Sequence, residues 1–258
     1  MDRATPAQPL PPPTLIGPAS GRPLSIGISP SLDAGRIRAG SEYLYLNRNY
    51  SRALAAAGAL PLVLSPEATA LDVVTSCDGL VLSGGGDLPE SFDAAAWSSG
   101  DWARAVPGEP EAAERIGWER ALLEAFAAAG KPVLGVCFGM QLMNLHFGGT
   151  LRLDLRQRTD GIDHGGGGRV ARHGLRVAVG SRFFAGLELP AEVNSLHRQG
   201  VGDVAPGFTA SAWAPDGVVE AIERPGLIGV EWHPEGDGSG PAVYARFVAL
   251  ARQARATA

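Results

Sequence analysis

The chain has 258 residues, enough for one large domain or two small ones with a sizeable core. Hydrophobic residues make up 45% and charged residues 19% of it, which is typical of ordinary globular proteins and excludes an intrinsically disordered chain. The formal net charge of −5 offers no basic surface to a phosphate backbone or an anionic membrane. Nucleic acid and membranes are therefore not expected partners.

The cysteines and the N-terminal segment indicate the compartment. Cys77 and Cys137 can form at most one disulfide, and a chain of this length needs none, so a reducing cytoplasm is expected. The sequence has neither an apolar run of about 18 residues nor a secretory signal. Residues 1–23 are rich in proline, which predicts a disordered tail, with a proline-motif ligand as the alternative. Residues 24–258 are expected to form a single domain.

Beyond the tail, apolar runs of strand length alternate with segments of helical spacing. Strands are predicted at 24–29, 60–64, 79–83 and 132–136, and those at 60–64 and 79–83 are expected to be buried. Helices are predicted at 41–57, 68–75 and 110–129. Such strands, apolar on both faces, predict an α/β fold with a mostly parallel sheet flanked by helices on both faces. Active sites of this architecture lie at the carboxyl ends of the strands.

The second half of the chain has a different character. A glycine-rich loop is expected at 161–168, and a closing helix at 241–255. Between them, additional short strands are predicted at 174–179, 208–213, 218–222 and 227–232.

The segment 132–141 joins an apolar strand to a helical pattern through Gly-Val-Cys-Phe-Gly. This spacing is that of a nucleophile elbow with cysteine in place of serine. Gly135 and Gly139 fit a turn too tight for side chains on either side of the nucleophile. The following helix N-terminus would stabilise a Cys137 thiolate. The structural alternative is a small buried core residue.

A second constellation, at 227–235, supplies a base. An apolar strand ends at His233, and Pro234 breaks it, so His233 is expected in a loop at the strand end. Glu235 could accept the other imidazole N–H and fix the tautomer. Taken alone, the His-Pro-Glu sequence is typical of a surface turn. Together with the elbow, it supplies the base and the acid of a triad whose nucleophile is Cys137.

The third segment, 80–87, is a strand followed by three glycines. A backbone without side chains can approach a reacting carbonyl, so one N–H of this loop and that of Phe138 are predicted to form an oxyanion hole. Gly85 is the first choice for the loop donor, with Gly84 and Gly86 as alternatives. A phosphate-binding loop is disfavoured because no Gly-Lys-Ser/Thr follows.

These three segments resemble the class I glutamine amidotransferase-like superfamily, with its flavodoxin-like fold, over nearly the whole chain from Ile26. Within it, the segments 193–199, 214–221 and 228–235 are similar to the γ-glutamyl-γ-aminobutyrate hydrolase group. The resemblance implies a cysteine hydrolase that forms a γ-glutamyl thioester, releases an amine and then releases glutamate, as in polyamine catabolism. It implies no metal and no organic cofactor.

The resemblance also implies roles for individual residues. Three match catalytic positions as nucleophile, base and orienting acid: Cys137, His233 and Glu235. Two match oxyanion-hole positions through their backbones: Gly85 and Phe138. Four fall where the superfamily holds the glutamyl group: Gln141, Asn194, Ser195 and His197.

One residue departs from the pattern of this family, and several others have a structural interpretation or no assigned role. The hydrolase group often has arginine after the nucleophile, where this chain has Phe138, which leaves the amine of the substrate open. His197 reads equally as a packed histidine that supports the sheet. Cys77 is expected to be a buried structural thiol. Three further histidines are given no role: His146, His164 and His173.

Three functions are compatible with the sequence. The first is a stand-alone hydrolase with a small-molecule γ-glutamyl amide as its partner, for which a homodimer is compatible. The second is the glutaminase subunit of an amidotransferase, which delivers ammonia to a synthase. The third is an inactive relative that senses a γ-glutamyl metabolite, which the intact Cys137, His233 and Glu235 disfavour.

Overall fold

The computed structural model describes residues 22–34, 37–90, 92, 110–158, 161–165 and 169–257. The predicted proline-rich tail lies outside the described residues up to residue 21, as do residues 166–168 of the predicted glycine-rich loop. Residues 161–165 of that loop are neither helix nor strand. Among the described helices, none is both long and apolar enough to cross a bilayer.

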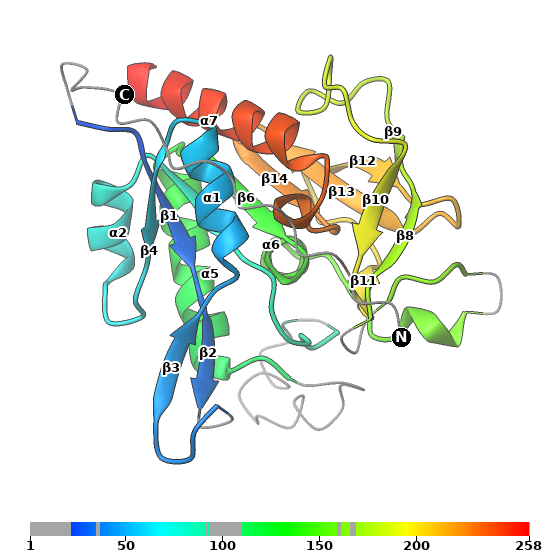
Figure 1. Ribbon diagram of the computed structural model, residues 1–258, viewed down its shortest axis with the longest axis horizontal. Helices are drawn as coiled ribbons and strands as arrows, with labels where there is room; N and C mark the ends of the chain where they lie inside the picture. Colours follow the sequence, from blue (N-terminus) through cyan, green and yellow to red (C-terminus); the bar gives the residue numbers. More distant parts are fainter. Residues whose placement is uncertain are drawn as a thin grey trace, which may run out of the picture.

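A parallel sheet forms the centre of the molecule (Figure 1). Its five strands, in spatial order, are β4 (Leu60–Val63), β1 (Ser25–Ser29), β5 (Gly79–Leu82), β6 (Val133–Val136) and β14 (Leu227–Val230). Every neighbouring pair among them is parallel, which confirms the predicted mostly parallel sheet. The carboxyl ends of β5, β6 and β14 therefore lie side by side.

Antiparallel strands extend this sheet beyond β14, as the change of pattern in the second half predicted. They are β13 (Val219–Arg224), β11 (Gly200–Val201), β7 (Leu151–Arg152), β12 (Thr209–Trp213) and β9 (Arg176–Val177). A separate antiparallel pair consists of β8 (Ala171–Gly174) and β10 (Glu192–Ser195). The strand predicted at 174–179 is thus two strands, β8 and β9, with different partners.

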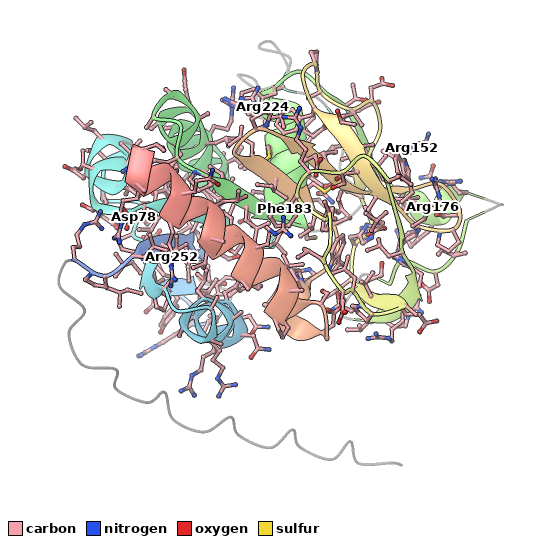
Figure 2. The ribbon with its side chains drawn as sticks, turned by 90° about the horizontal axis from the view of Figure 1, so that it is seen from above. Asp78, Arg152, Arg176, Phe183, Arg224 and Arg252 are labelled. Carbon is pink, nitrogen blue, oxygen red and sulfur yellow. The ribbon has the colours of Figure 1, made fainter. Side chains whose placement is uncertain are left out.

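Helices cover both faces of the parallel part. On one face, α1 (Arg48–Ala56) and α7 (Gly240–Thr257) share a hydrophobic core with β1 and β6. On the other face, a second core unites the sheet with α2 (Ala70–Ser76), α5 (Ala113–Ala128) and α6 (Phe138–His146). Arg252 ties α7 to the end of α1 by donating to the Gly58 carbonyl at 2.9 Å (Figure 2). The doubly covered sheet follows from strands that are apolar on both faces.

Two local predictions were wrong. Residues 41–57 do not form one helix: β3 (Glu42–Tyr45) pairs with β2 (Ser31–Ala34) as a hairpin, and only the later residues form α1. Asn47 begins that helix because its side chain accepts the Asn49 N–H at 3.0 Å. β4 is not buried either, since it is the outer edge of the sheet and leaves Val63 55% exposed.

Candidate functional site

Cys137 occupies a strained turn between β6 and α6. Its φ of 50° and ψ of −108° make it the one residue other than glycine with positive φ in the described part of the chain. Such a conformation costs about 1–3 kcal/mol and persists only where its surroundings enforce it. Two backbone hydrogen bonds do so, from the Cys137 N–H to Val230 at 2.8 Å and from the Gln141 N–H to Cys137 at 3.0 Å.

The two glycines of the elbow are sterically required, as the spacing predicted. A Cβ on Gly135 would lie 2.6 Å from the backbone of Gly139. A Cβ on Gly139 would lie 2.4 Å from the carbonyl oxygen of Leu82, on the neighbouring strand β5. Larger side chains would push the elbow away from the sheet.

The structure brings His233 to the same edge as Cys137. β14 is the parallel neighbour of β6, with Val230 opposite Val136, so the residues that follow the two strands meet. His233 Nδ1 lies 2.7 Å from Glu235 Oε1, which leaves Nε2 for the thiol. The Glu235 side chain is 2% exposed, so this carboxylate is held inside the protein.

Asn194 fixes the backbone of His233. The Asn194 side-chain amide donates to the His233 carbonyl at 2.8 Å and accepts the His233 N–H at 2.8 Å. Sequence reasoning expected Asn194 to contact substrate. The structure shows that both ends of its amide are already engaged by the base-bearing segment, although Asn194 also lines a neighbouring cavity.

Opposing electrostatic effects act on His233. Burial lowers the pKa of its imidazole, but the hydrogen bonds with Cys137 and Glu235, together with their charges, hold that pKa well above its ordinary value. The imidazole is therefore stable as a cation between a sulfur and a carboxylate.

The glycine loop after β5 packs directly on this histidine. A Cβ on Gly84 would lie 2.7 Å from His233 Cε1, so only glycine allows the ring its place. The Gly84 N–H donates to the Tyr50 hydroxyl at 3.0 Å, and the Gly86 N–H donates to Glu111 Oε2 at 2.9 Å.

Two backbone donors remain available beside Cys137. Within the described residues, no hydrogen bond engages the Gly85 N–H. Phe138 is the first residue of α6, so its N–H has no acceptor within the helix. These are the two groups that the sequence predicted as an oxyanion hole. The Phe138 side chain is fully buried, so its aromatic ring does not line the cavity.

Arg115 supports the glycine loop, and sequence reasoning missed it. This fully buried side chain of α5 donates to the carbonyls of Ser83 and Gly84 at 3.0 and 3.2 Å. It also pairs with Glu111 at 2.7 Å and with Glu119 at 2.6 Å. Because buried charges need partners, the spacing of one Arg between two Glu at i−4 and i+4 was the available signal.

A cavity of about 330 Å³ opens onto these groups. Its lining includes Cys137, His233, Gly85 and Glu111. An adjoining cavity of about 380 Å³ shares His233 and adds the polar side chain of Arg172. A larger cavity of about 750 Å³ lies beside α7 and β12, and none of the predicted site residues lines it.

Three of the predicted glutamyl-binding residues do not line either site cavity. Gln141, Ser195 and His197 are all at most 4% exposed. Gln141 donates to Glu231 and to the Gln199 carbonyl, and Ser195 Oγ donates to the His164 carbonyl at 3.0 Å. His197 packs against His164, with the ring centroids 4.8 Å apart. Contact of these residues with substrate stays a prediction.

The histidines that were given no role divide into two groups. His146 ends α6 and stacks edge-on against Phe147. His164 and His173 are 5% and 4% exposed, which sequence reasoning did not anticipate. Both cysteines are free, and Cys77 is buried, as predicted.

The sequence profile of the Peptidase C26 family matches residues 25–235, from the first strand to the acid beside His233. The chain belongs to the Peptidase C26 family. Its members share the class I glutamine amidotransferase-like fold that the sequence resembles.

Relatives of this C26 protein carry both hydrolase and amidotransferase names. It is 30% identical over 213 residues to the γ-glutamyl-γ-aminobutyrate hydrolase of Escherichia coli O157:H7, covering 75% of this chain and 80% of that protein. It is 34% identical over 200 residues to Rv2859c of Mycobacterium tuberculosis, a protein provisionally assigned as a glutamine amidotransferase. That match covers 74% of this chain and 62% of the relative's length.

Solved structures agree on the fold. A Thermoplasma acidophilum protein, provisionally assigned as one of the subunits of GMP synthase, superimposes with a TM-score of 0.62 at 18% identity, covering 92% of this C26 protein and 98% of that chain. A glutamine amidotransferase of Thermotoga maritima superimposes with a TM-score of 0.54 at 14% identity, covering 83% and 77%. At these identities the likeness concerns the fold alone.

Proposed function

We propose that this C26 protein is a cysteine-dependent hydrolase of γ-glutamyl amides. One observation carries the proposal: Cys137 and His233 follow neighbouring parallel strands and line one cavity, and the His233 imidazole contacts Glu235 at 2.7 Å. A thiol paired with an oriented imidazole is the arrangement of nucleophilic acyl transfer. The strained backbone of Cys137 supports this role, because such strain gathers at functional sites.

The geometry supports a two-step mechanism. The Cys137 thiolate attacks the γ-carbonyl carbon, and the N–H groups of Gly85 and Phe138 stabilise the oxyanion that forms. The C–N bond then breaks, and protonated His233 gives its proton to the leaving amine. Neutral His233 next removes a proton from water, whose oxygen attacks the thioester. Glutamate leaves, and the Cys137 sulfur is regenerated with His233 protonated.

Glu235 orients the base in this scheme. Its contact with Nδ1 directs Nε2 toward Cys137 and stabilises the imidazolium that is present before the first proton transfer and formed again by the second. Asn194 and Gly84 position the same ring through the backbone and through packing.

The substrate class is proposed from the relatives and the cavity. The Escherichia coli relative is named for γ-glutamyl-γ-aminobutyrate. The adjoining cavity has Arg172 and Tyr45 in its lining, groups able to meet a carboxylate at either end of such a substrate. Since Phe138 is buried, the amine is selected by other side chains.

A panel of γ-glutamyl amides tests the proposal. Glutamate release by the isolated protein from γ-aminobutyrate, polyamine, anilide and folate-type amides and from glutamine is compared with release by Cys137→Ala. We expect turnover of at least one non-glutamine amide, lost in the variant while circular dichroism is unchanged. A protein that is silent on the whole panel until a synthase is added would instead be an amidotransferase component. Retained activity in Cys137→Ala would defeat the assignment of the nucleophile.

A further inference from the structure

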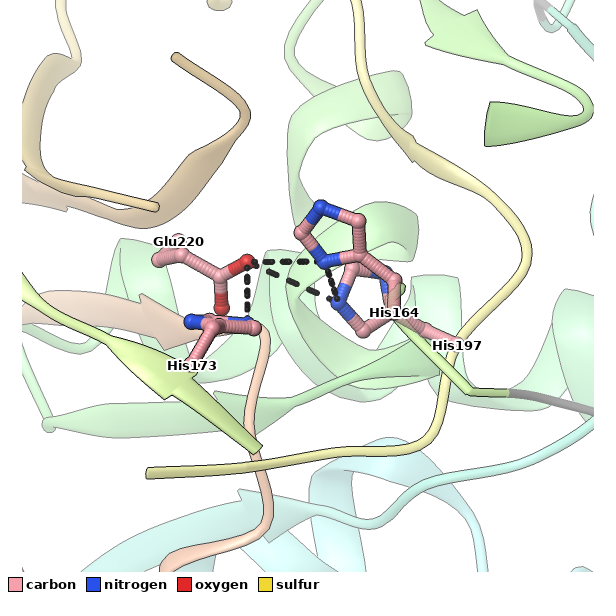
Figure 3. A group of neighbouring side chains, drawn as sticks. All are labelled: His164, His173, His197 and Glu220. Carbon is pink, nitrogen blue, oxygen red and sulfur yellow. Dashed lines mark hydrogen bonds and ion pairs between the residues drawn. The ribbon is translucent and has the colours of Figure 1, made fainter. Parts of the chain in front are cut away.

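Four buried side chains from different segments converge on one point (Figure 3). None of them lines either of the two cavities that contain His233. They come from the loop 161–165, from β8, from the segment after β10 and from β13: His164, His173, His197 and Glu220. Each is at most 5% exposed. Their facing nitrogen and oxygen atoms all lie within 4.8 Å of one another.

The atoms that face one another are spaced like the ligands of a tetrahedral ion. Glu220 Oε1 lies 3.6 Å from His164 Nδ1, 3.4 Å from His173 Nε2 and 3.5 Å from His197 Nε2. His164 Nδ1 lies 3.2 Å from His197 Nε2. Zinc bonds of about 2.0–2.1 Å in a tetrahedron place neighbouring ligand atoms roughly 3.3–3.4 Å apart. These four of the six spacings bracket that value, and all six lie within 4.8 Å.

The outward nitrogen of each imidazole already has an acceptor. His164 Nε2 lies 3.2 Å from Asp216 Oδ2, His173 Nδ1 lies 3.0 Å from the Gly174 carbonyl, and His197 Nδ1 lies 2.8 Å from the Gln199 carbonyl. Carboxylate and carbonyl oxygens require a proton on the nitrogen that they contact. In a neutral ring, the other nitrogen, which faces the cluster, then has no proton and presents its lone pair. Metal-binding histidines are held by such outer hydrogen bonds.

Three neutral imidazoles in these tautomers would direct lone pairs at one another and at the Glu220 carboxylate. In the described chain, His173 Nε2 and both Glu220 oxygens have no hydrogen-bond partner. Ser195 Oγ lies 3.0 Å from the His164 carbonyl oxygen and 3.3 Å from His164 Nδ1, and its single proton reaches neither His173 Nε2 nor Glu220. Four converging acceptors in a buried site are stable only around positive charge.

We propose that this cluster is a structural binding site for one divalent transition-metal ion, with zinc as the ion that suits its donors best. Three imidazole nitrogens and one carboxylate oxygen satisfy the preferences of zinc, and burial leaves no position for substrate. The ion would tie β13 to the β8–β10 pair. Because β10 carries Asn194, this also stabilises the residue that fixes the His233 backbone.

The test measures metal rather than activity, in a Cys137→Ala background so that the cavity thiol cannot bind the ion. Protein folded in the presence of Zn²⁺ is gel-filtered and analysed for first-row metals. We expect about one zinc per chain, with X-ray absorption giving zinc–nitrogen and zinc–oxygen distances of about 2.0–2.1 Å. Chelation during refolding should lower Tm, and equimolar Zn²⁺ should restore it.

Two substitutions complete the test. Glu220→Gln keeps the side-chain volume and removes the anionic ligand, so zinc affinity should fall at least tenfold. His146→Gln changes a histidine outside the cluster and should keep full occupancy. If the folded parent protein binds less than about a tenth of an equivalent and Zn²⁺ leaves its Tm unchanged, the cluster holds protons instead and the proposal is overturned. The result is independent of whether γ-glutamyl amides are hydrolysed.

Discussion

Replacing Asn194 with Asp separates positioning of the base from binding of substrate. The substitution preserves the acceptor for the His233 N–H and replaces the donor to the His233 carbonyl by an oxygen, across a contact of 2.8 Å. A lost hydrogen bond that leaves a buried carbonyl unsatisfied costs about 1–3 kcal/mol. Expressed fully in the transition state, this is roughly a 5- to 150-fold loss in kcat.

Asn144 offers a matched control away from the cavity. Its buried amide donates to the Thr150 and Asp203 carbonyls at 2.9 and 3.0 Å and accepts the Ala205 N–H at 2.8 Å. Asn144→Asp removes two such donations, so it should lose at least as much stability as Asn194→Asp, with kcat unchanged.

Steady-state glutamate release and thermal melts on both variants decide between the two roles. We expect Asn194→Asp to lower kcat with KM nearly constant, because the base moves while the substrate contacts remain. A rise in KM alone would show that Asn194 holds substrate. Equal losses of kcat in the two variants would refute the positioning argument.

Two more predictions concern the loop and the acid. Gly85→Ala would bring a Cβ to 2.4 Å from Arg115 Nη1 and should lower kcat by about 10²–10³, because it displaces an oxyanion donor. Gly117→Ala is the control, since its Cβ would enter open space and should leave kcat unchanged. Equal kcat values for the two variants would exclude Gly85 from the oxyanion hole. Glu235→Gln removes a charge that raises the pKa of His233, so activity that needs the imidazolium should be lost at a lower pH than in the parent protein. The alkaline limb of the pH profile of kcat/KM should therefore shift to lower pH. An unchanged limb would mean that another group orients His233.

The convergence of Cys137 and His233 could be predicted because it needs only two local patterns and one rule. Each residue follows an apolar strand, and strand ends meet at one edge of a parallel sheet. The order of the strands, which makes β6 and β14 direct neighbours, is a property of the packed sheet. No local sequence pattern predicts this strand order.

Residues that act through distant partners were missed for the same reason. Arg115 looks like one more charge on a helix until Glu111, Glu119 and the loop carbonyls close around it. His164 and His173 are separated in sequence from Glu220, so only the tertiary fold reveals their convergence. The hairpin before α1 was missed because Tyr43 happens to continue the spacing of the helix.

The exposed outer strand has a consequence for self-association. The N–H groups of Leu60 and Leu64 donate inward, to the carbonyls of Leu24, just before β1, and of Ile28 in β1, at 2.7 and 3.0 Å. Alternation along a strand then directs residues 61 and 63 away from the sheet. Residue 61 is proline and has no N–H, so Val63 alone supplies an outward donor from β4. The edge of β4 therefore lacks the continuous row of N–H donors that a strand of a second copy would need for pairing. This protects the protein from edge-to-edge association into fibrils.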